Sequence, residues 1–404
     1  MRIPSENTPP TGAECACQNY IAEFLGKLGW QPCIYGLDSV PGLTDHPLYW
    51  KGRNYSNRPN LGARRKGAGG GRSLLLSGHI DTVPRGTQPW TRGAFDATVE
   101  DNRLYGRGSN DMKGGVGTNL FVIETLHALG ISLRGDLVFE TVVDEEFGGV
   151  NGTLAGRLAG FNADAAIISE PSFLRICPAQ RGGRTAHITL HAAGGVLNEG
   201  KFPVGVVDQL TYLLARVQEF AAARRTKARV HEMYAQHADP VPVSITKVFT
   251  SPWGTREPIT IPETCQVEMY WQAMPGETQE NIEREFFEWF HAMVAGAPEL
   301  FSRPPAVEFP IRWLPGSAIL KSEPLIRELA QCAAGVLGQE PPIVGIEGPC
   351  DMYVFHQAFG MPAVLWGAKG GNTHGADEYL EIDSALDAAR TLLRFVCRWC
   401  GGPE

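Results

Sequence analysis

Apolar residues in this chain fall into two patterns, short continuous runs and longer stripes with helical spacing. A short continuous run bounded by polar residues or glycine predicts a buried strand. Such runs occur at Leu74–Gly78, Leu137–Val143, Ala165–Ile168 and Pro362–Trp366. Stripes that repeat every three or four residues predict helices, and they occur at Cys17–Leu28, Gly114–Leu129, Glu323–Leu337 and Asp383–Cys400. The alternation of strands and helices predicts an α/β domain, doubly wound around a mostly parallel sheet.

The pattern changes at about Arg181. Alternating segments predict strands at His187–Leu190, Val241–Val248 and Ile259–Trp271, and helical stripes cover Val206–Ala222 and Thr278–Ala295. Two helices with a few antiparallel strands predict a small α+β domain inserted into the larger one. We therefore expect a catalytic domain in two parts, 1–181 and 298–404, and an inserted domain over 182–297.

Polar residues that bind metals follow the predicted strands. His79 and Asp81 come directly after the first run, Glu145 and Glu146 after the second, and Glu170 after the third. The carboxyl ends of parallel strands meet at one edge of a sheet, where ligands of doubly wound folds bind.

Two further candidates lie in glycine-rich loops. Asp111 lies in the turn Gly106–Gly115, ahead of a predicted helix, and His374 lies in the loop after the last strand. A pair of divalent ions needs about three protein ligands each, with one carboxylate shared and a water between the ions. His79, Asp111, Glu146, Glu170 and His374 meet that requirement.

The chemistry of the candidate side chains indicates which metal they would bind and which role each acid would have. Imidazole with carboxylate favours Zn²⁺, or a similar ion such as Co²⁺ or Mn²⁺. Asp81 is placed to accept the N–H of the His79 imidazole and fix its tautomer. Adjacent acids at a strand end point in different directions, so we expect Glu146 to be a ligand and Glu145 to take a proton from the attacking water.

Each motif alone has a simpler explanation. The glycine-rich turn resembles a phosphate loop, but it lacks the Gly-Lys-Ser/Thr ending. Glu145 and Glu146 alone suit a solvated turn, and His374 alone suits a loop histidine bonded to Asp377. Their joint occurrence at strand ends favours a metal centre.

Composition restricts partners and location. The net charge is −8, and no basic run exceeds Arg64–Lys66, which argues against nucleic acid. Nine cysteines without a repeating spacing indicate a reducing compartment. Residues Met1–Pro10 contain no apolar h-region, and no run approaches roughly 20 apolar residues, so we expect a cytoplasmic protein without a signal peptide or a membrane span.

Five motifs together resemble a known family. They are Ser77–Pro84, Gly106–Gly115, Asp144–Glu146, Ser169–Pro171 and Thr373–Glu378. The chain resembles the dinuclear-zinc metallohydrolases that include aminoacylase, acetylornithine deacetylase, succinyl-diaminopimelate desuccinylase and glutamate carboxypeptidase.

The resemblance implies a role for each candidate residue. It places His79 and Glu170 on one ion, Glu146 and His374 on the other, and Asp111 between them. It makes Glu145 the general base and Asp81 a supporting residue. It also implies a cis peptide bond after Asp111, and an inserted domain that acts as a lid and forms a homodimer.

Two positions depart from the family pattern. Family lids carry a histidine that reaches a partner's active site and stabilises the oxyanion, and Val196 stands at that place here. His187 or His191 would substitute after a shift of the loop. Gln272 replaces an arginine of many relatives, which leaves recognition of a substrate carboxylate by the lid in doubt.

The sequence thus predicts a hydrolase that cleaves the amide bond of an N-acyl amino acid or small peptide-like substrate, similar to acetylornithine deacetylase. A dipeptidase or carboxypeptidase with the same metal site is the nearest alternative. A metal-retaining binding protein without turnover is a third, but such a protein would not need Glu145.

Overall fold

The computed structural model describes residues 1–194, 203–250 and 261–403. These residues form two compact units. The first unit comprises Met1–Gln180, Ala318–Ile346 and Cys350–Glu404, and the second comprises Arg181–Ser317 and Glu347–Pro349. Among the described residues, no helix is long and apolar enough to cross a membrane.

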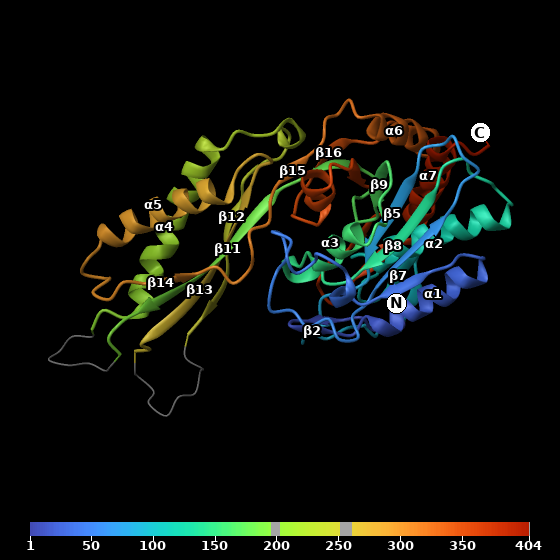
Figure 1. Ribbon diagram of the computed structural model, residues 1–404. Coiled ribbons are helices and arrows are strands. Elements are labelled where there is room, and N and C mark those ends of the chain that lie inside the picture. The colour runs from blue at the N-terminus through green and yellow to red at the C-terminus, as the bar shows by residue number, and fades with distance from the viewer. Residues whose placement is uncertain (195–202, 251–260, 404) are drawn as a thin grey trace. The chain divides into compact units, whose positions relative to one another are not determined.

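The first unit is built on a nine-stranded sheet with helices packed against it (Figure 1). The strand order is β15-β10-β17-β9-β5-β8-β4-β3, with β16 paired to β10. The strands are β3 (Cys33–Tyr35), β4 (Asn60–Arg65), β5 (Leu74–His79), β8 (Leu137–Val142), β9 (Ala165–Ile168), β10 (Ile176–Gln180), β15 (Ser317–Ala318), β16 (Ile343–Ile346) and β17 (Ala363–Leu365). The helices are α1 (Cys15–Lys27), α2 (Lys113–Ala128), α3 (Asn151–Leu158), α6 (Pro324–Leu337) and α7 (Ile382–Cys400).

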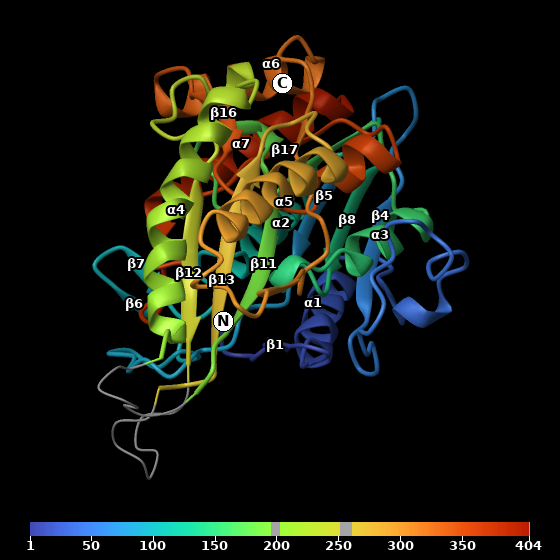
Figure 2. The same ribbon diagram turned by 90° about the vertical axis from the view of Figure 1, so that its left-hand side faces the viewer.

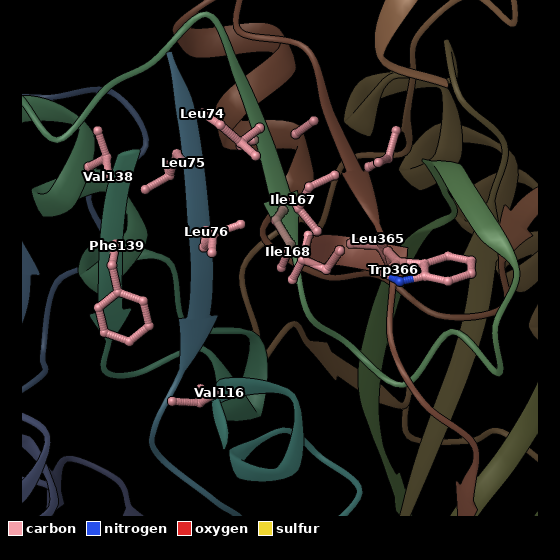
Figure 3. Close-up of a cluster of buried hydrophobic side chains, with 14 of the residues drawn as sticks. Leu74, Leu75, Leu76, Val116, Val138, Phe139, Ile167, Ile168, Leu365 and Trp366 are labelled. Carbon is pink, nitrogen blue, oxygen red and sulfur yellow. The ribbon is translucent and has the colours of Figure 1, made fainter. Parts of the chain in front are cut away.

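The middle of this sheet is parallel, as the continuous apolar runs predicted. Strands β17, β9, β5 and β8 pair in parallel, whereas β4 and β3 are antiparallel additions at one side. Every residue of β5, β8 and β9 is buried, and their side chains form the core shown in Figure 3. Burying one such aliphatic side chain contributes about 1.5–3 kcal/mol. The predicted α/β class is confirmed, and the sheet combines this parallel middle with antiparallel strands on both sides.

Strand register brings the carboxyl ends together. His79 pairs with Val142 of β8, and Ser77 pairs with Ile168 of β9. The loops that carry Glu145 and Glu170 therefore begin at the same edge as His79.

A second, four-stranded sheet joins two loops that are far apart in the chain. It contains β6 (Thr98–Glu100), β7 (Arg103–Tyr105), β18 (Gly370–Gly371) and β19 (Tyr379–Glu381), in the order β18-β19-β7-β6. Pairing of β7 with β19 places the turn after β7 near the loop between β18 and β19. These are the loops of Asp111 and His374.

The second unit is the smaller α+β part. Its sheet has the order β12-β13-β11-β14, formed by β11 (Gly182–His191), β12 (Val243–Phe249), β13 (Thr264–Ala273) and β14 (Ala306–Glu308). Helices α4 (Val206–Lys227) and α5 (Gln279–Ala295) lie on one face of this sheet (Figure 2). Phe286 of α5 stacks on Trp271 of β13 with ring centroids 4.8 Å apart. Because β14 pairs with β11, this unit continues beyond residue 297, to Ser317.

Candidate metal centre

The five predicted ligands all belong to the first unit and converge there. His79 is the last residue of β5, Glu146 begins a short 3-10 helix after β8, and Glu170 follows β9 by two residues. Asp111 lies just before α2, and His374 lies between β18 and β19. The peptide bond between Asp111 and Met112 is cis, as the family resemblance implied.

His79, Asp111 and Glu170 form the first group of donors. His79 Nε2 lies 3.0 Å from Asp111 Oδ1 and 3.6 Å from Glu170 Oε1. One ligand atom from each of the three residues lies within 4.8 Å of the others. A single ion can contact all three at that spacing.

Asp111, Glu146 and His374 form the second group, with the same spacing. His374 Nε2 lies 3.3 Å from Asp111 Oδ2 and 3.2 Å from Glu146 Oε2. The two Asp111 oxygens therefore face different groups, which is the arrangement of a carboxylate that bridges two ions. The simpler explanation for His374 was a hydrogen bond to Asp377. The Asp377 carboxylate accepts the backbone N–H groups of Thr91 and Arg92.

Crowding of acids around buried imidazoles shifts the pKa values of the cluster. Hydrogen bonds from the His374 imidazole to the carboxylates of Asp111 and Glu146 raise the pKa of His374 to about 10. Burial lowers the pKa of His79, but the surrounding acids outweigh it and hold this pKa well above its usual range. Burial and the Asp111 charge raise the pKa of Glu170 to about 8. Without metal, the cluster holds protons that a cation would displace.

Glu145 stands beside the cluster without belonging to either group. Its Oε2 lies 3.9 Å from His79 Nε2. Burial raises its pKa well above the usual range, His79 opposes this rise, and Asp351 and Glu170 add to it. A carboxyl group that readily holds a proton suits proton transfer. The neighbouring acid Asp351 was not predicted from the sequence.

Asp81 supports the site through different atoms from those expected. The His79 Nδ1 atom lies 2.9 Å from the Asp81 backbone carbonyl oxygen and 3.6 Å from its carboxylate. That carboxylate accepts the backbone N–H groups of Glu145, at 3.1 and 3.2 Å, and of Glu146, at 3.1 Å. The carbonyl thus orients the imidazole, and the carboxylate orients the two glutamates.

Sequence reasoning missed the role of Glu378. This fully buried carboxylate accepts the backbone N–H groups of Asn110, at 2.8 Å, and Asp111, at 3.0 Å, through Oε1. Its Oε2 accepts the N–H of Gly108 at 3.0 Å and the Arg107 guanidinium at 2.6 Å. Glu378 belongs to a quoted motif, but nothing local shows that it binds a loop 267 residues away.

Arg107 extends this contact to the second loop. Its Nη2 donates to the His374 backbone carbonyl at 3.1 Å, and Asn110 Nδ2 donates to the Thr373 hydroxyl at 2.6 Å. Glu378 and Arg107 therefore fix Asp111 and His374 relative to each other.

The two family departures fall in the second unit. Val196 lies outside the described residues. His187 on β11 contacts Glu268 at 3.0 Å. Gln272 is buried, accepts a hydrogen bond from Arg181 at 2.6 Å and donates to the Glu347 carbonyl at 2.8 Å. Gln272 is thus engaged within its own unit.

Comparisons with known proteins identify the family of the chain. A profile described as peptidase family M20/M25/M40 matches residues 75–398. The N-formyl-4-amino-5-aminomethyl-2-methylpyrimidine deformylase of Halalkalibacterium halodurans is 29% identical over 97% of this chain and 91% of its own length. The acetylornithine deacetylase of Erwinia tasmaniensis is 27% identical over 85% of this chain and 84% of its own.

A solved structure gives the same result for the fold. The structure of human carnosine dipeptidase 1 superposes with a TM-score of 0.72 at 15% identity, covering 96% of this chain and 91% of its own. The family profile spans most of the chain, and the fold, the donor cluster and the relatives all agree with it. The chain belongs to peptidase family M20/M25/M40 and is a hydrolase of amide C–N bonds.

Proposed function

We propose that the chain is a metal-dependent deacylase that removes the acyl group from a small N-acylated amine. N-acyl amino acids and N-formyl amines are the two substrate classes to test first, because the deacetylase and deformylase relatives are named for them. The observation that carries the proposal is the convergence of two donor groups on Asp111, with Glu145 beside them.

The residues present fit a pair of divalent cations. Each donor group combines one imidazole with two carboxylates, and the shared Asp111 presents one oxygen to each. This chemistry favours Zn²⁺, with Co²⁺ or Mn²⁺ as alternatives. We assign His79 and Glu170 to one ion, Glu146 and His374 to the other, and Asp111 to both. When bound, such ions lower the pKa of a water molecule and polarise the amide carbonyl.

Glu145 moves the proton in this scheme. It takes a proton from the water whose oxygen adds to the carbonyl carbon. It then delivers that proton to the amide nitrogen as the C–N bond breaks, so the products are a carboxylic acid and an amine. Asp81 holds the backbone of Glu145, so the carboxyl group acts from a fixed position.

Homodimer formation through the second unit is part of the proposal. Val207 and Leu214 are 60% and 40% exposed on one side of α4, and Phe249 of the edge strand β12 is 62% exposed. Large apolar side chains left exposed on neighbouring elements are one feature of an interaction surface. The molar mass in solution, measured by light scattering for wild type and Val207→Glu, tests it: the variant should be monomeric if the wild type is a dimer.

The decisive experiment measures metal content and turnover for wild type and Glu145→Gln. The substrates are an N-acetyl and N-formyl panel of amino acids and heterocyclic amines, with free and N-blocked dipeptides. We expect wild type to bind two ions and cleave blocked substrates. Glu145→Gln should keep its metal and lose about 10²–10⁴-fold in kcat.

The surface variant Glu124→Gln is the matched control, because Glu124 is exposed on α2, and it should behave as wild type. Loss of metal together with activity in Glu145→Gln would show that Glu145 is not the proton carrier. Cleavage restricted to dipeptides with a free amine would replace the deacylase with a dipeptidase.

A further inference from the structure

The N-terminal segment Ile3–Thr8 lies alongside the loop that follows β5. The Asn7 N–H donates to the Thr82 carbonyl at 2.8 Å, and the Thr82 N–H donates to the Ser5 carbonyl at 3.0 Å. The Ser5 hydroxyl donates to the Ile80 carbonyl at 2.7 Å. This segment is outside the residues that the family profile matches, yet it borders the loop of Asp81.

Asn7 joins two buried acids of the site. Its Nδ2 atom donates to Asp81 Oδ2 at 2.8 Å and to Asp144 Oδ1 at 3.3 Å. All three residues are fully buried. The Asp81 charge repels that of Asp144 in such surroundings, and the guanidinium groups of Arg58 and Arg53, 3.6 and 3.7 Å from Asp144 Oδ1, partly offset this repulsion. A neutral amide with two N–H groups bonds to both without adding a third charge.

Both acids control the backbone that carries Glu145. Asp81 accepts the N–H groups of Glu145 and Glu146. Asp144 immediately precedes Glu145 and has a φ of +61°, a left-handed conformation that is unfavourable for a residue with a side chain. The Asp144 carboxylate accepts the Tyr55 hydroxyl at 2.7 Å as well as Asn7. Contacts of this side chain therefore hold the unfavourable turn in place.

We propose that Asn7 is a positioning residue for the pair Glu145 and Glu146, acting through Asp81 and Asp144. The proposal rests on the proposed function, in which Glu145 moves the proton. Asn7 belongs to neither donor group. It keeps the two supporting carboxylates in place, and they fix the direction in which the glutamates leave the strand.

The variants Asn7→Ala and Asn7→Asp test this role. Alanine removes both donors, and aspartate also adds a third negative charge. We expect kcat to fall about 10–100-fold for Asn7→Ala and further for Asn7→Asp, with KM changed less than kcat and both ions retained. Thr8→Ala is the control, because Thr8 is exposed and its hydroxyl contacts Thr11. A lower melting temperature with unchanged kcat would overturn the proposal, since it would show a purely structural role.

Backbone hydrogen exchange provides a readout that does not need activity. The N–H groups of Glu145 and Glu146 should exchange at least about tenfold faster in Asn7→Ala, while those of β5 keep their wild-type rates. Unchanged exchange in this turn overturns the proposal. If wild type cleaves no substrate, the proposed function fails, but the exchange result still decides whether Asn7 orders the turn.

A double-mutant cycle tests whether Asn7 affects kcat through Asp144. If Asn7 acts through Asp144, Asn7→Ala and Asp144→Asn should lower kcat together by less than the product of their separate effects. Fully independent effects would contradict that route. If Asn7→Ala does not fold, Asn7→Ser is used in all three measurements, because a hydroxyl keeps one donor.

Discussion

Replacing Glu378 by glutamine should weaken the metal centre without touching a ligand. The wild-type carboxylate is fully buried, and each of its oxygens accepts two N–H donors. Glutamine keeps one of these oxygens and puts an NH₂ group in place of the other. Whichever way the amide is oriented, two N–H groups of the Arg107–Asp111 turn then face a donor and lose their acceptor.

The size of the effect follows from those contacts. A hydrogen bond to a charged group contributes about 1.5–3 kcal/mol, so losing two costs about 3–6 kcal/mol. Breaking a buried ion pair such as that between Glu378 and Arg107 costs about 3–5 kcal/mol by itself. These costs describe the same loss and are not added. Residues that orient metal ligands typically change metal affinity about 10–100-fold.

The two ions should be affected unequally. Glu378 fixes Asp111 directly and His374 through Arg107. Glu378 thus holds two members of the second donor group, Asp111 and His374. In the first donor group it holds only Asp111. We therefore expect Glu378→Gln to lose the ion of Glu146 and His374 first, so that the bound metal falls from two ions towards one at limiting concentration.

Titration calorimetry of the metal-free protein and metal analysis after gel filtration measure this change. Asp377→Asn is the matched control, because its carboxylate accepts hydrogen bonds from Thr91 and Arg92 instead of the turn of Asp111. It should keep both ions. Equal weakening of both sites in Glu378→Gln, or two ions bound with wild-type affinity, would refute the reasoning.

Three further predictions concern pH and packing. Because the pKa values of both cluster imidazoles are raised without metal, metal binding at pH 7 should release protons, measured by calorimetry in buffers of different ionisation enthalpy. Gly115→Ala should unfold at a lower temperature, because a Cβ there would lie 1.9 Å from the Ser169 carbonyl oxygen. Burial raises the pKa of Asp136, but the Lys66 hydrogen bond and others outweigh it and lower that pKa. The stabilisation from the Asp136 carboxylate is therefore complete above about pH 4 and declines as pH falls through its lowered pKa, so Asp136→Asn should melt below wild type at pH 7, and the difference in melting temperature should shrink as pH falls below about 4.

The fold class and the site could be predicted from the sequence where a residue of metal-binding type directly followed a run of apolar residues. The runs at Leu74–Gly78 and Ala165–Ile168 predicted strands that are buried on both faces, because continuous apolar residues have no other stable location. Residues of metal-binding type follow the ends of these strands, as His79 and Glu170 do. Parallel strands place such residues at the same edge of the sheet, so they could be predicted to lie close together. Fold class and the convergence of the donors both followed from that arrangement.

The supporting contacts were not predictable, because they join segments far apart in the chain. Pairing of β7 with β19 brings Glu378 to the turn of Asp111, and neither strand has a strong apolar pattern. Asp81 was predicted to contact the His79 imidazole, since the two residues are close in sequence. Its backbone carbonyl makes that contact, at 2.9 Å from His79 Nδ1, whereas its carboxylate accepts the amides of a loop more than sixty residues away, which was not predicted.

The acids Asp144, Glu145 and Glu146 show what determines the role of each. Side chains of this chemistry at consecutive positions look interchangeable in a sequence. In the structure the first contacts Tyr55 and Asn7, the second lies 3.9 Å from His79, and the third belongs to the donor group of His374. The left-handed φ of Asp144 turns the chain there, and the residues that bind its carboxylate stabilise the turn. We therefore expect the contacts of Asp144 to decide which glutamate binds metal and which moves a proton, and changing those contacts should alter catalysis while every proposed ligand remains in place.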